Sequence, residues 1–407
     1  MKSVLLPSLL CVISCAGAFS LYSIDKNPYS LGSGEYMQQC GARQCGMGGA
    51  GLALSDSVNY NSANPATFGG IDFTTVSVTY RPEMTFLKDA HSGFKDFSND
   101  FPFAELTISL GPYGTIFGGY RREQLLDYSV RYTDAQGYLI DRTGFGGTYG
   151  TFGGYALELQ KRFAMGLSFE ALYGRTSTST AIVERPSEEF YLQPSLLQKT
   201  RFKAYQFTLG GMARLGKWSV AASGTAPLPL TGSTIDREHQ IIQNYSGSDS
   251  VVIKQIDFFD ETFVPLRGSM GCAYTPFKRL HCALDLNTVF WHMEGRGSEY
   301  RVGVGAEYFF ADKRSPHYFL NIPLRAGYYF HDLGYNQAVV EQAGTFGFTL
   351  PTRNNYGSIT VGLEAGRRYG DAYPEYVESF ARISIQMTHK GRWGRLRRLK
   401  DFTLEPQ

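Results

Sequence analysis

The stretch YRVGVGAEYF, residues 300–309, decides the fold. Its even-numbered residues from 300 to 308 are Tyr, Val, Val, Ala and Tyr, whereas its odd-numbered residues from 301 to 307 are Arg, Gly, Gly and Glu. Successive side chains of a β-strand point to opposite faces. The stretch therefore predicts a strand with one apolar face and one polar face.

The same alternation recurs in about fourteen segments after residue 70, which predicts an all-β chain. The segments are 71–81, 102–111, 113–123, 148–162, 164–175, 200–215, 216–225, 265–275, 279–292, 299–311, 316–331, 341–350, 355–368 and 377–388. Most have about ten residues or more, whereas strands of soluble sheets have about five or six. A tilted strand needs about 9 to 11 residues to cross a bilayer.

The connections between these segments alternate between short and long. Short links are expected around Gly111-Pro112, Ala164, Gly216, Pro276-Phe277, Asp312-Lys313 and Thr352-Arg353. Long loops are expected elsewhere, including 82–101 and 226–264, and the first of these is apolar enough to catch a ligand. One rim with turns and one rim with loops is typical of outer-membrane barrels. We therefore predict a closed, antiparallel, up-and-down transmembrane β-barrel of about 14 strands.

Aromatic residues gather at the rim with the short turns, as in the interfacial girdle of a membrane barrel. They are Tyr113, Phe163, Trp218, Tyr274, Phe277, Phe309 and Phe310. The polar faces of the strands then point into the lumen, with charged candidates at Glu105, Glu158, Glu170, Asp285, Arg301, Glu307, Arg325, Glu364 and Arg382. Their spacing shows no catalytic pair, so we expect a salt-bridge network that holds an internal plug.

The N-terminus indicates export. Lys2 precedes an apolar run that ends at Ala16-Gly17-Ala18, a pattern that signal peptidase recognises. Cys15 in a relaxed lipobox leaves lipoprotein processing as an alternative. The predicted organisation is a signal peptide at 1–18, a plug at 19–70, the barrel at 71–388 and a basic periplasmic tail at 389–407.

Composition argues against several other functions. The formal net charge is +2, which gives no case for nucleic-acid binding. No Cys-x-x-Cys or Gly-x-Ser-x-Gly motif is present and the seven histidines are scattered, so we expect no metal, no cofactor and no enzymatic activity. Two cysteine pairs remain open as disulfides, Cys40 with Cys45 and Cys272 with Cys282.

Residues 46–70, GMGGAGLALSDSVNYNSANPATFGG, open with the glycine spacing of a dinucleotide-binding loop. Such a loop needs a buried strand before it and a helix after it, and neither context is present. Glycine also permits positive φ and close backbone approach, which a segment packed inside a barrel needs.

The stretch GARQCGMGGAGLALSDSVNYNSANPATF resembles the N-terminal hatch of the FadL (long-chain fatty acid transporter, OmpP1-like) family of outer-membrane proteins. The residues that carry the resemblance are Gly46, Met47, Gly48, Gly49, Ala50, Gly51, Asp56, Asn64, Pro65 and Ala66, after Gly41-Ala42-Arg43. The C-terminal GRRYG step at 366–370 and Trp393 resemble the closing hairpin of the family. Thr67-Phe68 departs from the Gly-Leu that is usual after Asn-Pro-Ala, and the chain does not end on an aromatic residue.

The resemblance implies passive uptake of hydrophobic or amphiphilic, fatty-acid-like small molecules across a Gram-negative outer membrane. The expected partners are outer-membrane lipids, a hydrophobic ligand and the barrel-assembly machinery. The alternative is a surface-attachment or secretion-shuttle barrel that acts through protein contacts. Pro323 is a candidate break in the wall, because proline cannot donate to the hydrogen-bond ladder.

Overall fold

The computed structural model describes residues 34–56, 59–88, 93–133, 139–184, 194–229, 234–243, 249–258, 264–291, 297–311, 315–335, 338–352, 356–370 and 377–391. The predicted signal peptide, Cys15 and nearly all of the predicted basic tail lie outside these residues. Among the described residues, no helix is long and apolar enough to span a membrane.

Within the described residues, fourteen antiparallel strands close into one barrel, because β17 pairs with β2 and β8 pairs with β11. The barrel strands are β2 (Thr74–Lys88), β3 (Gly93–Ser109), β4 (Thr115–Thr133), β5 (Leu139–Leu159), β6 (Phe163–Glu184), β7 (Pro194–Leu215), β8 (Trp218–Leu228), β11 (Leu266–Phe277), β12 (Leu280–Phe290), β13 (Glu299–Tyr308), β14 (Leu324–Asp332), β15 (Val340–Pro351), β16 (Gly357–Tyr369) and β17 (Val377–Gly391). Each of them overlaps one predicted segment.

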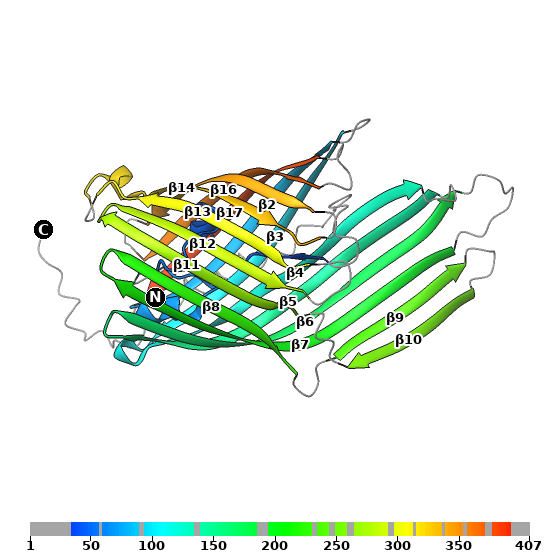
Figure 1. Cartoon of the computed structure of the whole chain (residues 1–407), viewed down its shortest axis with the longest axis horizontal. Helices are drawn as coiled ribbons and strands as arrows, with labels where there is room; N and C mark the ends of the chain where they lie inside the picture. Colours follow the sequence, from blue (N-terminus) through cyan, green and yellow to red (C-terminus); the bar gives the residue numbers. More distant parts are fainter. Residues whose placement is uncertain are drawn as a thin grey trace, which may run out of the picture.

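Three further strands of the described residues are not members of this closed ring. β1 (Glu35–Tyr36) pairs with β4, and β9 (Thr234–Gln243) pairs with both β7 and β10 (Asp249–Phe258). The β9–β10 hairpin extends the sheet beyond the mouth of the barrel, next to the long ends of β5 to β7 (Figure 1). The prediction of a long loop over 226–264 is therefore wrong for most of its length.

Several strands at the end of the barrel that carries the β9–β10 hairpin are longer than the predicted segments. β2 and β3 continue as a paired hairpin to Lys88 and from Gly93, so the predicted ligand-catching loop at 82–101 is mostly strand. Of its apolar residues, Met84, Phe86 and Phe97 are exposed. The strands β5, β6 and β7 have 21, 22 and 22 residues, about twice what a bilayer requires.

Most connections at the opposite end are tight turns. β5 and β6 are joined through Gln160 and Lys161, which both have positive φ, and β7 and β8 are joined through Gly216. Asp312 and Lys313, where a tight turn is predicted, lie outside the described residues. Residues 309–323 connect β13 to β14 and contain the 3-10 helix η4 (Tyr318–Asn321).

Pro323 consequently lies just before Leu324, the first residue of β14. Backbone pairing with β13 and β15 begins at Leu324. Proline therefore occupies the position before a strand, where no ladder hydrogen bond is needed. Pro323 therefore lies in the connection before β14 and does not interrupt a strand of the wall.

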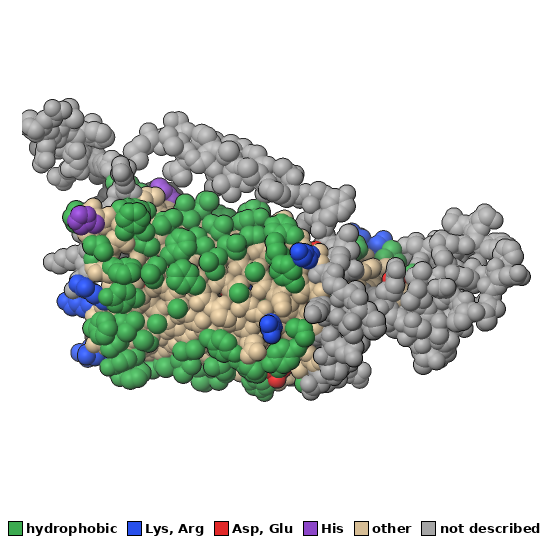
Figure 2. All heavy atoms as spheres, turned by 90° about the horizontal axis from the view of Figure 1, so that it is seen from above, with side chains coloured by type: hydrophobic (Ala, Val, Ile, Leu, Met, Phe, Trp, Pro, Cys, Tyr) green, Lys and Arg blue, Asp and Glu red, His purple; other side chains and the backbone are tan. Residues whose placement is uncertain are grey.

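Apolar and polar side chains alternate along the wall. In β13, Val302 and Val304 are exposed while Arg301 and Glu307 are buried. Figure 2 shows apolar side chains spread over the visible outer face, with a group of Lys and Arg at the end that carries the short turns and a few more towards the other end. The aromatic residues at that end include Tyr113, Phe163, Trp218 and Phe277, all at least half exposed. This is the surface of a barrel that faces lipid.

The register argues against one of the two cysteine pairings that the sequence left open. Cys272 lies opposite Leu284, and Cys282 lies opposite Tyr274, so the two thiols are offset by two residues. The hairpin is centred at residue 278, one position after the predicted centre. Because the two strands run in opposite directions, this shift of one residue places each residue opposite a partner two positions further along the chain.

Candidate functional site

The N-terminal segment, residues 34–71, packs against the inner face of the wall. It contains β1, the short helix α2 (Ala42–Cys45) and the 3-10 helix η2 (Pro65–Gly70). Every residue from Cys40 to Leu54 is buried. The segment contacts strands from both halves of the barrel, and its contacts define the candidate site.

The glycines of the segment allow its backbone to touch the backbone of the wall. Gly48 has φ of +69°, and a Cβ on it would lie 2.4 Å from the carbonyl oxygen of Tyr328. The wall also has a glycine at this contact, since a Cβ on Gly305 would lie 2.3 Å from the carbonyl oxygen of Met47. Glycine on both sides is therefore a packing requirement.

Two carboxylates of β12 and β13 hold the first half of the segment. Asp285 accepts hydrogen bonds from the backbone N–H groups of Gly51 and Leu52, at 2.8 and 2.7 Å. Glu307 binds the guanidinium of Arg43 from α2 through two hydrogen bonds, of 3.1 and 2.5 Å. Arg325 binds Glu307 as well, at 2.7 Å, so that one buried carboxylate receives two cations.

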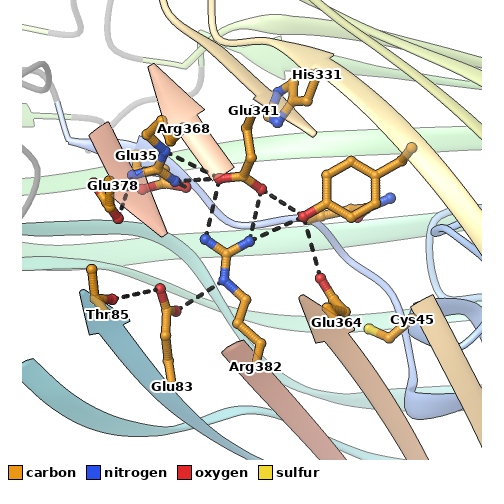
Figure 3. A network of polar contacts seen from close by, with 12 residues as sticks. Glu35, Cys45, Glu83, Thr85, His331, Glu341, Glu364, Arg368, Glu378 and Arg382 are labelled. Carbon is orange, nitrogen blue, oxygen red and sulfur yellow. Dashed lines mark hydrogen bonds and ion pairs between the residues drawn. The ribbon is translucent and has the colours of Figure 1, made fainter. Parts of the chain in front are cut away.

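A larger network surrounds Glu341 on β15 (Figure 3). Its carboxylate binds Arg368 at 2.6 Å and Arg382 at 2.7 Å, and accepts a 2.6 Å hydrogen bond from the hydroxyl of Tyr329. Arg368 also reaches Glu35 of β1 at 2.7 Å. The start of the N-terminal segment is therefore joined to the wall by an ion pair between the half-buried Glu35 and the buried Arg368.

A second network joins the segment to β4 and β11. Glu123 binds Arg121 at 2.9 Å and Arg267 at 2.8 Å, and accepts a 2.5 Å hydrogen bond from the side chain of Gln39. Arg267 also donates to the hydroxyl of Tyr36. Isolated buried charges are costly, and this arrangement gives each one a partner.

The end of the segment is held mainly by packing. Phe68 stacks between Tyr60 and Phe117, with ring centroids 4.4 and 4.0 Å away. Asn64 caps η2 by accepting a hydrogen bond from the N–H of Ala66 at 3.1 Å. Glycines of β6 and β7 again provide the room, since a Cβ on Gly166 would lie 2.4 Å from the carbonyl carbon of Pro65.

The two departures from the family motif have clear local roles. The hydroxyl of Thr67 accepts a hydrogen bond from the N–H of Asn61 at 2.9 Å and donates to the carbonyl of Asn64 at 2.8 Å, which closes the turn before η2. Phe68 forms the aromatic stack described above. Thr67-Phe68 therefore ties this turn to the wall of the barrel.

Cys40 and Cys45 lie side by side at the two ends of the turn that contains α2, with their sulfur atoms in contact and both side chains buried. The guanidinium of Arg81 lies 3.4 Å from the sulfur of Cys45. The hydrogen bond from Cys45 and the charge of Arg81 lower the pKa of the Cys40 thiol to about 7. A disulfide between these two residues, left open by the sequence, is not formed in this structure.

The structure places most of the predicted lumen residues in these contacts. Glu105 accepts from Ser62 of the segment, Glu158 pairs with Arg214, and Glu170 pairs with Arg121. Glu364 accepts a long, 3.4 Å hydrogen bond from Tyr329, over whose ring the guanidinium of Arg301 lies at 3.7 Å. Of the hatch residues, Asp56 is exposed and lies 3.7 Å from Arg43.

A small polar cavity of about 60 Å³ remains between the segment and β8, β11 and β12. Tyr36, Gln38, Arg267, Asp285 and Asn287 are among the residues that line it. Pockets that hold drug-sized ligands usually have about 300–1,000 Å³. Within the described residues, no group of three or more His, Cys, Asp or Glu side chains is arranged to hold a metal ion.

The sequence profile of the BamG family matches residues 2–262, which is more than half of the chain. The chain belongs to the BamG family. Comparison with curated protein sequences gives no match.

Solved structures resemble this BamG-family chain in fold. A FadL homologue from Pseudomonas aeruginosa has a TM-score of 0.60 at 11% identity, covering 88% of this chain and 99% of its own. The toluene transporter TbuX of Ralstonia pickettii has a TM-score of 0.59 at 12% identity, and the CymD monoaromatic hydrocarbon channel has 0.59 at 13%, each covering 87% of this chain and 98% of its own. The predicted resemblance to FadL-type barrels is confirmed for the fold.

Sequence reasoning missed several residues of this candidate site. Glu341, Arg368 and Glu123 lie within or at the end of predicted strands, on the polar face, so the alternation alone would have placed them inward. Arg43 belongs to the family-like motif, but its partner Glu307 is 264 positions away. Which charges meet depends on the closure of the barrel.

Proposed function

We propose that this chain is an outer-membrane barrel with a closed lumen that acts through protein contacts, in association with the barrel-assembly machinery. Residues 34–71 are, in this proposal, a permanent plug. The observation that carries it is the fastening of this segment at both ends, by Glu341 and Glu123 networks on one side and by the Phe68 stack on the other.

The energetics favour a plug that stays in place. To leave the lumen, the segment would have to separate Arg43 from Glu307 and Glu35 from Arg368, both inside the barrel. Breaking a buried ion pair and leaving one charge unpaired costs about 3–5 kcal/mol. The uptake that the family resemblance implies involves such a movement, whereas a role through protein contacts needs none.

The family name supports the proposed partner. The name BamG hints at an association with the barrel-assembly machinery. The β9–β10 hairpin, which extends the sheet beyond the mouth of the barrel, provides surface for a protein partner outside the closed ring (Figure 1). The FadL-type fold points to the outer membrane as the location.

The test is affinity purification of the tagged chain from outer membranes in mild detergent, with quantitative mass spectrometry of what copurifies. Subunits of the barrel-assembly machinery should be enriched over an equally abundant, identically tagged outer-membrane barrel. A variant that lacks residues 234–258 should retain the plug and lose part of this enrichment. Equal recovery of these subunits with the control barrel would overturn the proposal.

A second candidate is passive uptake of hydrophobic or amphiphilic, fatty-acid-like molecules. The observation that favours it is the fold, shared with a toluene transporter and a monoaromatic hydrocarbon channel. The test is mass spectrometry of the organic extract of the purified protein. An apolar metabolite that is retained by the intact protein and absent from the control barrel would favour uptake.

A further inference from the structure

The outer wall of the barrel carries a trough over β7 and β8. Two neighbouring rows of the register define it: Phe163, Ala213 and Val220 in the first row, and Met165, Gly211, Ala222 and Met270 in the second. In the second row, large side chains on β6 and β11 flank two small ones on β7 and β8.

The trough is open and apolar. Met165 and Met270 are 54% and 67% exposed, so both project from the outer wall. A Cβ on Gly211 would meet nothing within 4 Å. The groove has a volume of about 790 Å³. Three steps between strands of about 4.8 Å separate the backbones of Met165 and Met270 by about 14 Å.

The trough extends a limited distance along the strands, from the rim of the barrel towards its middle. Leu209, four residues from Ala213 along β7, is 54% exposed and is the next large outward-facing side chain on that strand. Four residues of strand span about 13 Å. At the other end, Trp218 lies at the rim of the barrel, where its ring marks the interface between lipid and water.

The turns next to this rim are cationic. The turn between β5 and β6 carries Lys161 and Arg162, and the turn between β7 and β8 carries Lys217. All three are exposed. The N–H of Arg214 donates to the carbonyl of Arg162 at 2.7 Å, which holds the two turns side by side.

The next turn along the rim has the same sign of charge. It joins β11 to β12 and contains Lys278 and Arg279. The turn residues 160–162, 216–217 and 278–279 include no Asp or Glu. Cationic residues at a membrane interface attract anionic headgroups, each by about 1 kcal/mol.

We propose that this face is a binding site for one anionic phospholipid of the periplasmic leaflet. An acyl chain lies in the trough over Gly211 and Ala222, and the phosphate lies against Lys161, Arg162 and Lys217. The site is independent of whether the lumen conducts ligands, since it lies on the opposite face of the wall.

The test is native mass spectrometry of the delipidated full-length protein in detergent, mixed with dioleoylphosphatidylglycerol or, separately, with dioleoylphosphatidylcholine. We expect one phosphatidylglycerol to be retained in preference to phosphatidylcholine. The triple variant Lys161→Gln, Arg162→Gln, Lys217→Gln should lose phosphatidylglycerol by roughly fivefold per charge removed, with little change for phosphatidylcholine.

Two further variants separate the trough from the charges. Gly211→Phe fills the trough from the outer face and should reduce retention of both lipids. The matched control Arg175→Gln, Arg201→Gln, Lys203→Gln removes three exposed cations from β6 and β7 far from the trough, and should retain the lipid as the wild type does. Equal retention of the two lipids, or an equal loss in the control, would overturn the proposal.

Discussion

The two halves of the barrel hold the N-terminal segment by different means. Strands β11 to β17, together with Glu123 of β4, hold its first half through buried charges, with Glu307 and Glu341 as the main anchors. Strands β4 to β7 hold its second half mainly through the stack of Phe68 on Phe117, whereas glycines that let the backbones touch occur in both halves. Charges select one partner and one register, whereas apolar packing excludes water from the contact.

The difference implies a different sensitivity to mutation. A carboxylate that neutralises two guanidinium groups leaves two buried charges behind when it is removed. An aromatic ring leaves a cavity, which neighbouring side chains can partly fill. The following predictions use this contrast, from the largest expected effect to the smallest.

Glu341→Leu should have the largest effect on stability. It leaves Arg368 and Arg382 without their shared carboxylate, and we expect a loss of about 3–5 kcal/mol in the free energy of unfolding. Urea unfolding in detergent micelles, followed by the shift between folded and unfolded bands on an unheated gel, measures this loss. Replacing Glu341, Arg368 and Arg382 together with leucine should restore part of the lost stability. A triple variant as unstable as Glu341→Leu would contradict the charge argument.

Phe68→Ala should destabilise by about 3 kcal/mol, because the ring fills the space between Tyr60 and Phe117. The same unfolding assay applies. Phe145→Ala is the control, since Phe145 is 65% exposed and its removal should change stability by less than about 0.5 kcal/mol. Equal effects of the two variants would show that the aromatic stack does not hold the segment.

Asp285→Ala should cost about 1–3 kcal/mol, since the N–H groups of Gly51 and Leu52 lose their acceptor in a buried place. Limited proteolysis should report it as well, with faster cleavage within residues 40–54 while the barrel stays folded. An unchanged cleavage rate in this stretch would show that Asp285 does not hold the segment against the wall.

Thr67→Val should have the smallest effect, about 1 kcal/mol, because it keeps the shape and removes the two hydrogen bonds to Asn61 and Asn64. Thr67→Ser, which keeps the hydroxyl, is the matched control. A Thr67→Val variant as stable as Thr67→Ser would contradict the role assigned to the two hydrogen bonds.

The sequence predicted the barrel well because lipid imposes a strict pattern on its wall. All fourteen predicted segments overlap barrel strands, and residues such as Val302 and Val304 face outward in the structure. The signal is strong where one face contacts hydrocarbon and the other contacts polar groups.

The sequence predicted less well where lipid is absent. The ends of β2 and β3 and the whole of β9, TIDREHQIIQ, lie beyond the part of the wall that carries the apolar pattern, so they read as loops. The turn before β14 was missed because η4 interrupts a run that otherwise resembles a strand.

The candidate site was predictable in kind and not in detail. The glycines at 46–51 indicated close backbone contact, and Gly48 makes that contact with Tyr328. Pairs such as Glu35 with Arg368 join residues 333 positions apart. Their meeting depends on the closure of the barrel and on the path of the segment, which no local pattern contains.

Hydrogen–deuterium exchange of residues 40–54 in the folded, detergent-solubilised protein tests the central claim most directly. A permanent plug predicts that these amides exchange as slowly as those of β13 to β15 in the same sample, because their opening requires the buried ion pairs to break. Exchange many times faster than in β13 to β15 would show that the segment leaves the wall while the barrel stays intact. That result would contradict the closed-lumen account and favour uptake through the barrel.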